Sequence, residues 1–299
     1  MENRKKLVVV AGPTAVGKTS VAIMLARQLN CHIVSADARQ FFREMTIGTA
    51  KPTADELQAA PHHFIDSHSI TQPYDAATYG TDALVCIHHL FERHSYVVLC
   101  GGSGLYIKAV LEGFDDIPDI DPAIRQGLRS AYELGGLEVL QEKMKALDPA
   151  HYSKIDTRNP QRLMRALEVV MGTGQSITSF QQRKSRTHDF SIVKIGLDLP
   201  RQELYDRIDL RMDRMIEDGL FDEAASLYPF RSHHALQTVG YREVFDFIEG
   251  KYDRQEAIRL LKQHSRQYAK RQLTWFKRDP EMIWLHPANI NDIIDVASR

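Results

Sequence analysis

A phosphate-binding loop close to the N-terminus constrains the fold of this chain more than any other stretch. Residues 12–19 read GPTAVGKT, which fits the pattern G-x-x-x-x-G-K-[ST]. A valine-rich run at residues 7–11 precedes the loop, and apolar residues at helical spacing follow it over residues 21–29. This order of strand, loop and helix presents backbone N–H groups at a helix N-terminus, where an anion is favoured. The chain is therefore expected to hold a phosphate group there.

Later apolar runs extend this start into a sheet. Residues with strand-like composition occur at 32–35, 96–100, 191–199 and 282–285. A helix-compatible segment at residues 76–91 lies between the first two of these runs. Buried strands that alternate with helices are typical of a parallel sheet covered on both faces. We therefore predict an α/β fold with a P-loop NTPase-like core, formed by residues 1–116 and 188–299 with C-terminal helices.

The character of the chain changes after Gly113. The stretch FDDIPDIDP is acidic and is broken by two prolines, and the residues up to about 185 show helical patterns without a convincing strand. We predict that residues 117–187 form an all-helical insertion domain that interrupts the core.

Composition excludes several classes of protein. The three cysteines, Cys31, Cys86 and Cys100, have neither a disulfide-framework pattern nor zinc-binding spacing, which indicates a reducing compartment. The apolar runs are too short for a signal-peptide core or a membrane span. Adjacent histidine pairs lack ligand-like spacing. We expect a cytoplasmic protein without membrane contact, and a monomer.

The phosphate-binding loop assigns a separate task to each residue type. Gly12 and Gly17 allow the backbone to approach a phosphate closely. Lys18 adds a positive charge, and the Thr19 hydroxyl is placed to ligate Mg²⁺ or a phosphate oxygen. The predicted phosphate-binding residues of the loop are Gly12, Pro13, Thr14, Ala15, Val16, Gly17, Lys18 and Thr19.

The sequence lacks the strand-terminal Asp that a triphosphatase site normally contains in addition to the phosphate-binding loop. Such an enzyme should offer an apolar strand that ends in a metal-orienting Asp, but YVVLC at residues 96–100 is followed by GGSG. The nearest carboxylate in a comparable place is Asp37, just past the second strand and on the same sheet edge as the loop. It could hold a metal through water, accept a proton, or serve only as a helix cap or turn residue.

Seven segments, in order, resemble the tRNA dimethylallyltransferases, also called tRNA isopentenyltransferases. They are GPTAVGKT, SADARQFFREMTIGTAKP (35–52), GGSGLYIKA (101–109), QRLMRALEV (161–169), LYDRIDLRMDRMIEDGLFDEA (204–224), VGYRE (239–243) and RQYAKRQLTWFKRD (266–279). The resemblance implies transfer of the dimethylallyl group of dimethylallyl diphosphate to N6 of the adenine on the 3′ side of the tRNA anticodon, with release of diphosphate. The loop would then hold the diphosphate of a prenyl donor.

The resemblance also implies roles for individual residues. Asp37 would take the proton from the attacking amine, Thr19 would act with Mg²⁺ near the breaking C–O bond, and Lys18 would face the diphosphate. Arg207 and Arg211 lie four apart on an expected helix, and we predict Arg211 as a further diphosphate contact. The residues expected to contact the tRNA anticodon stem-loop are Asp37, Ala38, Arg39, Gln40, Ser103, Arg125, Gln161, Arg162, Leu163, Met164 and Arg165.

Three positions depart from the family pattern. Ala38 stands where serine is usual, Ser103 replaces threonine with its hydroxyl kept, and Glu44 stands where glycine is common. The other residues of the D-x-R-Q stretch are unchanged, so we expect activity to be retained. RNA affinity or the choice of tRNA is where a difference is expected.

Local charge agrees with an RNA partner although the formal net charge is only −1. Residues 154–186 carry two acidic and seven basic side chains, the latter being Lys154, Arg158, Arg162, Arg165, Arg183, Lys184 and Arg186. Residues 262–278 carry six basic side chains and no acidic one, interleaved with aromatic residues. Asn159-Pro160 reads as a helix start, which would place Arg162 and Arg165 on one face. A basic helix taken alone is more often merely solvated.

Two other functions fit parts of the pattern. A small-molecule or nucleotide kinase would also use the phosphate-binding loop and an Asp after a strand. A nucleotide-switched RNA-binding protein would use the loop and the basic segments without catalysis. Neither explains why all seven segments occur in this order.

Overall fold

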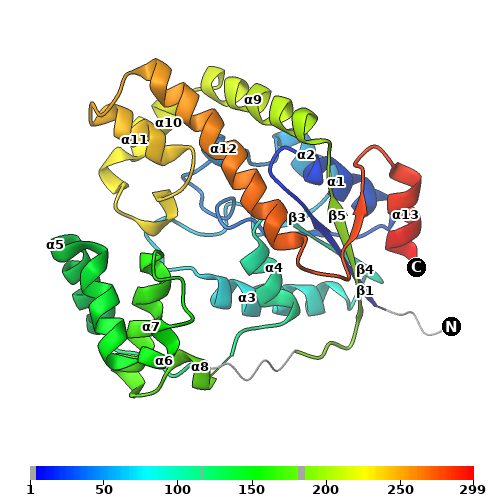
Figure 1. Cartoon of the computed structure of the whole chain (residues 1–299). Helices are drawn as coiled ribbons and strands as arrows, with labels where there is room; N and C mark the ends of the chain where they lie inside the picture. The colour runs from blue at the N-terminus through cyan, green and yellow to red at the C-terminus, as the bar shows by residue number, and fades with distance from the viewer. Residues whose placement is uncertain (1–4, 116, 181–185) are drawn as a thin grey trace. The chain divides into compact units, whose positions relative to one another are not determined.

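The computed structural model describes residues 5–115, 117–180 and 186–299 (Figure 1). The chain divides into two compact units. Met1–Gly113 with Thr187–Arg299 form one, here called the α/β unit, and Phe114–Arg186 form the other, the helical unit. Among the described residues, no helix is long and apolar enough to cross a membrane.

A six-stranded sheet forms the centre of the α/β unit. Its strands are β1 (Lys6–Ala11), β2 (Ile33–Ser35), β3 (His62–His63), β4 (Tyr96–Gly101), β5 (Ser191–Leu197) and β6 (Ile283–Leu285). Their order is β3-β2-β4-β1-β5-β6, and every neighbouring pair is parallel. The predicted α/β fold is thus confirmed, and the phosphate-binding loop follows β1, one of the two central strands.

Helices and short 3₁₀ turns connect these strands or, in the case of α13, follow the last one. They are α1 (Lys18–Gln28), η1 (Ile47–Thr49), α2 (Ala54–Ala59), α3 (Ala76–Leu90), α4 (Gly104–Leu111), α9 (Arg201–Glu217), α10 (Leu220–Leu227), η2 (Tyr228–Phe230), η3 (His234–Leu236), α11 (Tyr241–Ile248), α12 (Arg254–Phe276) and α13 (Ile290–Ser298). The long helix α12 lies beside α9 and contacts α4 (Figure 1).

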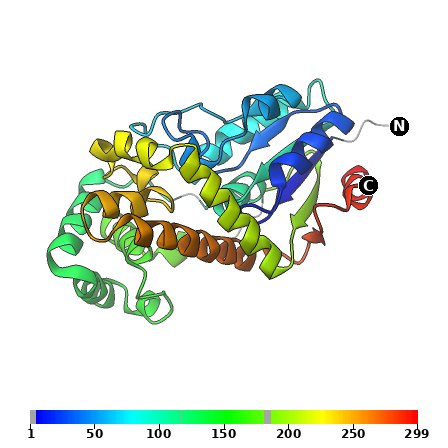
Figure 2. The same cartoon turned by 90° about the horizontal axis from the view of Figure 1, so that it is seen from above.

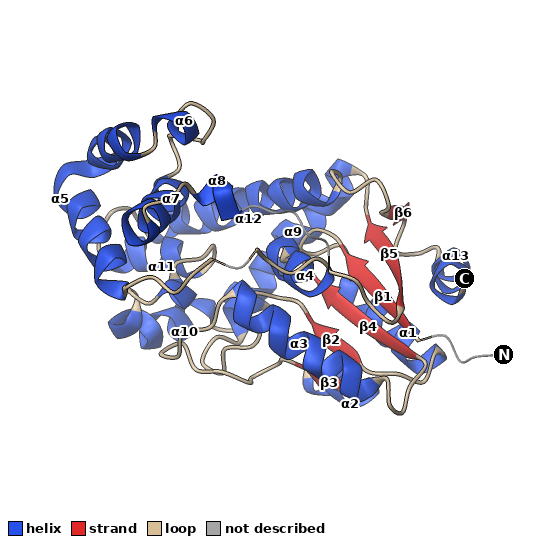
Figure 3. Ribbon diagram, turned by 90° about the horizontal axis from the view of Figure 1, so that it is seen from below, coloured by secondary structure: helices blue, strands red, loops and turns tan. Residues whose placement is uncertain are grey.

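Both faces of the sheet are covered, and each face has its own apolar cluster. Leu7 and Val9 of β1 pack on one side in a cluster that includes residues of α3 and α4. Val8 and Val10 pack on the other side with residues of α1 and α13. Figures 2 and 3 view the molecule from opposite sides, and α3 and α4 lie in front of the strands in Figure 3. Because side chains alternate along a strand, one valine-rich run serves both clusters.

The helical unit contains α5 (Pro122–Leu147), α6 (Pro149–Tyr152), α7 (Pro160–Thr173) and α8 (Ile177–Phe180). Buried Leu128, Leu140 and Leu167 belong to its separate apolar cluster. Asn159 caps α7 by accepting the N–H of Arg162 at 3.2 Å, with proline in the first turn as the sequence predicts. Two basic residues of the predicted basic segment, Arg183 and Lys184, lie outside the described residues.

Candidate active site

Two glycines allow the phosphate-binding loop to adopt its backbone conformation. Gly17 has φ of 103°, a left-handed conformation that side chains disfavour, and it immediately precedes α1. A Cβ atom on Gly12 would lie 2.7 Å from the carbonyl oxygen of Leu197 in β5. The first turn of α1 therefore presents its unpaired N–H groups beside an open loop, which is the arrangement that binds phosphate oxygens.

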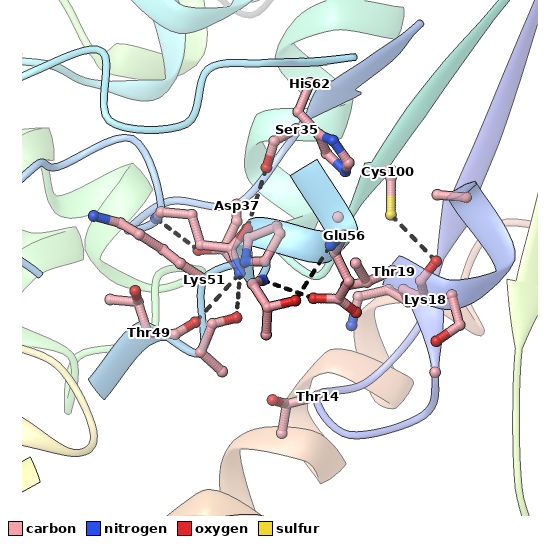
Figure 4. A pocket seen from close by; sticks show the side chains of 18 of the residues that line it. Thr14, Lys18, Thr19, Ser35, Asp37, Thr49, Lys51, Glu56, His62 and Cys100 are labelled. Atoms are coloured by element: carbon pink, nitrogen blue, oxygen red, sulfur yellow. Dashed lines mark hydrogen bonds between the residues drawn. The ribbon is translucent and has the colours of Figure 1, made fainter. Parts of the chain in front are cut away.

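A cavity of about 510 Å³ adjoins this loop. Figure 4 shows Lys18 and Thr19 on its right and Asp37 and Thr49 on its left, with Thr14 below. The α/β unit supplies the whole lining. The site therefore brings the loop residues and the candidate base Asp37, which are predicted from separate motifs, to one cavity.

Lys18 is the principal cation beside the loop. Its Nζ donates a hydrogen bond to the carbonyl oxygen of Pro13 at 2.7 Å. Burial lowers the pKa of this ammonium group to about 8, and the nearby Asp37 carboxylate opposes the shift only in part. A bound anion would favour the charged form and raise this pKa again.

Arg211 reaches the same cavity from α9. Its Nη2 donates a hydrogen bond to the Thr14 hydroxyl, so the guanidinium group is tied to the loop. Arg207, four residues earlier, instead pairs with Glu203 at 2.9 Å on an exposed part of the helix. Of the two arginines considered from the sequence, Arg211 lines the cavity, whereas Arg207 lies at its edge, with Nη1 4.0 Å from where a Cβ atom on Gly17 would be.

Asp37 forms a turn directly after β2. Its Oδ1 accepts the backbone N–H groups of Arg39 at 2.9 Å and Gln40 at 3.3 Å. The carboxylate is thus a turn residue, one of the alternatives open from the sequence. Both bonds go to Oδ1, so Oδ2 stays outside the turn on a side chain that lines the cavity. The turn fixes the carboxylate without using both of its oxygens.

The three residues after Asp37 have different surroundings. The Ala38 N–H donates to the Ser103 hydroxyl at 2.9 Å. Arg39 donates from Nη1 to the Ala38 carbonyl, whereas its Nε is buried without a hydrogen-bond partner among the described residues. Gln40 donates to the carbonyl oxygens of Thr49 at 3.3 Å and Ala50 at 3.0 Å. Gln40 therefore shapes the cavity wall, and Arg39 is the residue with an unsatisfied donor.

The helical unit exposes only part of the predicted RNA-contact stretch. Leu163 and Met164 are buried in its apolar cluster, so their side chains are not at the surface. Gln161, Arg162 and Arg165 are exposed. Arg165 pairs with Glu168 at 3.2 Å, and Arg125 pairs with the same carboxylate at 3.1 Å. This group of charges carries a net positive charge.

The basic run at residues 262–278 lies on α12 and the turn after it. Acidic residues of other elements form ion pairs with three of its six basic side chains. Lys262 and Arg266 form ion pairs with Asp213 and Asp209 of α9, and Lys277 pairs with Asp198. The remaining basic residues of the run, Lys270, Arg271 and Arg278, are exposed. The sequence count, which considered only acidic residues inside the run, overstated its net charge.

Two residues that hold the site together, Glu223 and Gln272, were not predicted from the sequence. Glu223 of α10 accepts the N–H groups of Thr46, Ile47 and Gly48 at 3.0, 2.8 and 2.9 Å, and so anchors η1 beside the cavity. Gln272 of α12 is a buried polar residue that contacts the phosphate-binding loop. The available signal was a polar residue at a helical spacing of three or four from buried Ala269 and Phe276.

The oxygen donors of the site suit a magnesium ion that a diphosphate helps to bind. Among the described residues, no three His, Cys, Asp or Glu side chains are grouped to hold a metal ion. The Thr19 hydroxyl and the Asp37 carboxylate line the cavity. Mg²⁺ commonly keeps several waters and takes few protein ligands together with substrate phosphates. The donor set fits that ion, which the Thr19 hydroxyl would help to hold.

Comparisons with known proteins show which family this chain resembles. A family model described as IPP transferase matches residues 40–279. A tRNA dimethylallyltransferase of Cytophaga hutchinsonii is 49% identical over 289 residues, covering 97% of this chain and 95% of that one. One from Flavobacterium johnsoniae is 46% identical over 297 residues, covering 97% and 96%.

Solved structures also resemble this chain. The full-length tRNA isopentenylpyrophosphate transferase of Bacillus halodurans is 38% identical, with a TM-score of 0.72 over 99% of this chain and 95% of that one. A eukaryotic dimethylallyltransferase crystallised while acting on tRNA is 24% identical and shares the fold, with a TM-score of 0.79 over 98% and 77%.

The low pKa of Lys18 predicts a pH dependence of anion binding. Binding requires the ammonium form, so the affinity for inorganic diphosphate should fall as the pH rises through about 8, approaching tenfold per pH unit above it. Calorimetric titration between about pH 7 and 9 would measure this. In the Lys18→Arg variant the side chain stays charged over that range, so the affinity should not show this decline. Any pH dependence that the variant still shows comes from titration of diphosphate itself. Parallel profiles for the two proteins would contradict the assignment.

Proposed function

This chain belongs to the tRNA dimethylallyltransferase family, and on that basis we propose that it prenylates the adenine on the 3′ side of the anticodon. The donor is dimethylallyl diphosphate, and the product is N6-isopentenyladenosine with free diphosphate. The observation that carries the proposal is that the phosphate-binding loop and the Asp37 carboxylate line one cavity. We further propose that the enzyme acts as a cytoplasmic monomer.

The donor half of the reaction is served by the loop. Lys18 and Arg211 line the cavity beside the backbone N–H groups of the loop. There they would stabilise the negative charge that grows on the bridging oxygen as the allylic C–O bond breaks. Mg²⁺, when bound beside Thr19, would neutralise part of that charge. The reaction consumes no ATP, because the diphosphate that leaves belongs to the prenyl donor.

The acceptor half is served by Asp37. The exocyclic amine of adenine is a weak nucleophile, so a carboxylate that accepts its proton assists formation of the N6–C bond. Oδ2 is suited to this step because Oδ1 is occupied in the turn. As the N6–C bond forms, the C–O bond to diphosphate breaks and the N6 proton passes to Asp37.

The target adenine must leave its stack to reach this carboxylate. Arg39 follows Asp37 by two residues, and its buried Nε has no hydrogen-bond partner in the described part of the chain. This donor would support binding of the extruded base or its neighbours. In the helical unit, exposed Arg162 and the cluster of Arg125 and Arg165 around Glu168 are proposed contacts to the anticodon stem-loop backbone.

Replacement of the proposed base tests the catalytic role of Asp37. Asp37→Asn should lower the single-turnover transfer rate about 10²- to 10⁴-fold, since the amide accepts a proton poorly. Binding of tRNA, measured by filter retention, should stay within about threefold of the unaltered protein. Asp292→Asn, an exposed change on α13, is the control and should transfer normally. Normal turnover in Asp37→Asn would refute the general-base role.

Removal of the two exposed arginines of α7 tests the RNA contact. Arg162→Ala with Arg165→Ala should weaken tRNA binding and reduce the slope of log K against log salt by roughly one to two, because fewer phosphates are neutralised. Arg129→Ala removes an exposed arginine that pairs with Glu133 in the same unit, and it should leave the slope unchanged. An unaltered slope in the double variant would argue against the contact.

A further inference from the structure

The GGSG turn after β4 occupies the place where a triphosphatase has its metal-orienting Asp. In this structure the turn is a meeting point of other elements. The Ser103 hydroxyl accepts the N–H of Ala38, next to the candidate base. The carbonyl oxygen of Gly102 accepts a hydrogen bond from Gln272 of α12 at 2.8 Å. The turn therefore connects the Asp37 segment with a helix that begins more than two hundred residues later.

Gln272 also reaches the phosphate-binding loop. Its side chain is buried, and its Oε1 accepts the backbone N–H of Thr14 at 2.9 Å. The two partners fix the orientation of the amide, because an N–H group can only donate and a carbonyl oxygen can only accept. One side chain thus bridges the loop that faces the diphosphate and the turn that holds Ala38.

The glycines of the turn explain how α12 comes this close. A Cβ atom on Gly102 would lie 2.4 Å from Nε2 of Gln272. A Cβ atom on Gly104 would lie 2.2 Å from the indole ring of Trp275, which follows Gln272 by three residues on the helix. Side chains at these positions would push the helix away, so GGSG serves as the docking surface of α12.

We propose that Gln272 is a positioning residue that fixes the phosphate-binding loop relative to the Asp37 turn. The connection runs from Thr14 through the Gln272 amide to Gly102, and from the adjoining Ser103 to Ala38. This role rests on the proposed function, in which the loop holds the donor and Asp37 faces the acceptor. Small errors in the relative placement of two reactants lower a transfer rate strongly, even where each reactant still binds.

Gln272→Met tests the bridge, because methionine has a similar length and makes neither hydrogen bond. With labelled dimethylallyl diphosphate and tRNA both saturating, the single-turnover rate should fall about 10- to 100-fold. The Kd values for inorganic diphosphate and for tRNA should each stay within about threefold of the unaltered protein. Gln267→Met, an exposed change on the same helix, should match the unaltered protein in all three measurements.

A double-mutant cycle separates positioning from a general loss of structure. Ser103→Ala breaks the other end of the same connection, so it should also lower the rate. In the double variant with Gln272→Met, the fold-loss in rate should be far smaller than the product of the two single fold-losses. Circular dichroism would give the folded fraction, and rates would be expressed per folded molecule.

Three results would overturn the proposal: a Gln272→Met rate within twofold of normal, a loss that disappears per folded molecule, or strictly multiplicative losses in the cycle. If Gln272→Met does not fold, Gln272→Glu replaces it, since glutamate keeps the acceptor for Thr14 and loses the donor to Gly102. That variant should show the same rate loss, and a normal rate would overturn the proposal. Absence of transfer by the unaltered protein would instead contradict the proposed function.

Discussion

The candidate anion site at the N-terminus of α1 is the feature around which the charges of the cavity are arranged. The loop that creates it leaves β1, which pairs along its whole length with β4 and β5. Burial beside the loop penalises the charged forms of Lys18 and Arg211, and the carboxylate of Asp37 partly compensates for both. A bound diphosphate would stabilise the charged forms of both side chains further. Binding of the donor and the charge state of the site therefore depend on each other.

The C-terminal end of β4 differs from that of a triphosphatase. A triphosphatase places a carboxylate there, whereas this enzyme places a glycine-rich turn against α12 and takes its carboxylate from the end of β2. The same cavity is then lined by both the phosphate-binding loop and this carboxylate. The loop recognises a phosphate group, and the residues around the loop determine which phosphate compound binds.

The sequence predicts the elements whose signals are local. The strand, loop and helix of residues 6–28, the cap at Asn159 and the parallel sheet could all be predicted from spacing and residue type. Strand β3 has only two histidines, too few for a periodic signal. The buried side chains of Leu163 and Met164 lie on the same short stretch as exposed arginines, so a motif alone does not tell which of them face outward. Ion pairs between α12 and α9, and the bridge through Gln272, join residues that only folding brings together.

The most direct test of the account is to ask which phosphate compound the loop serves. Unmodified tRNA would be incubated with the enzyme and either isotope-labelled dimethylallyl diphosphate or γ-labelled ATP, and its nucleosides analysed by mass spectrometry. The account predicts label on adenosine only with the allylic donor, with one diphosphate released for each modified base and no requirement for ATP. Transfer of the γ-phosphate of ATP, or no adenosine modified by the allylic donor, would contradict it.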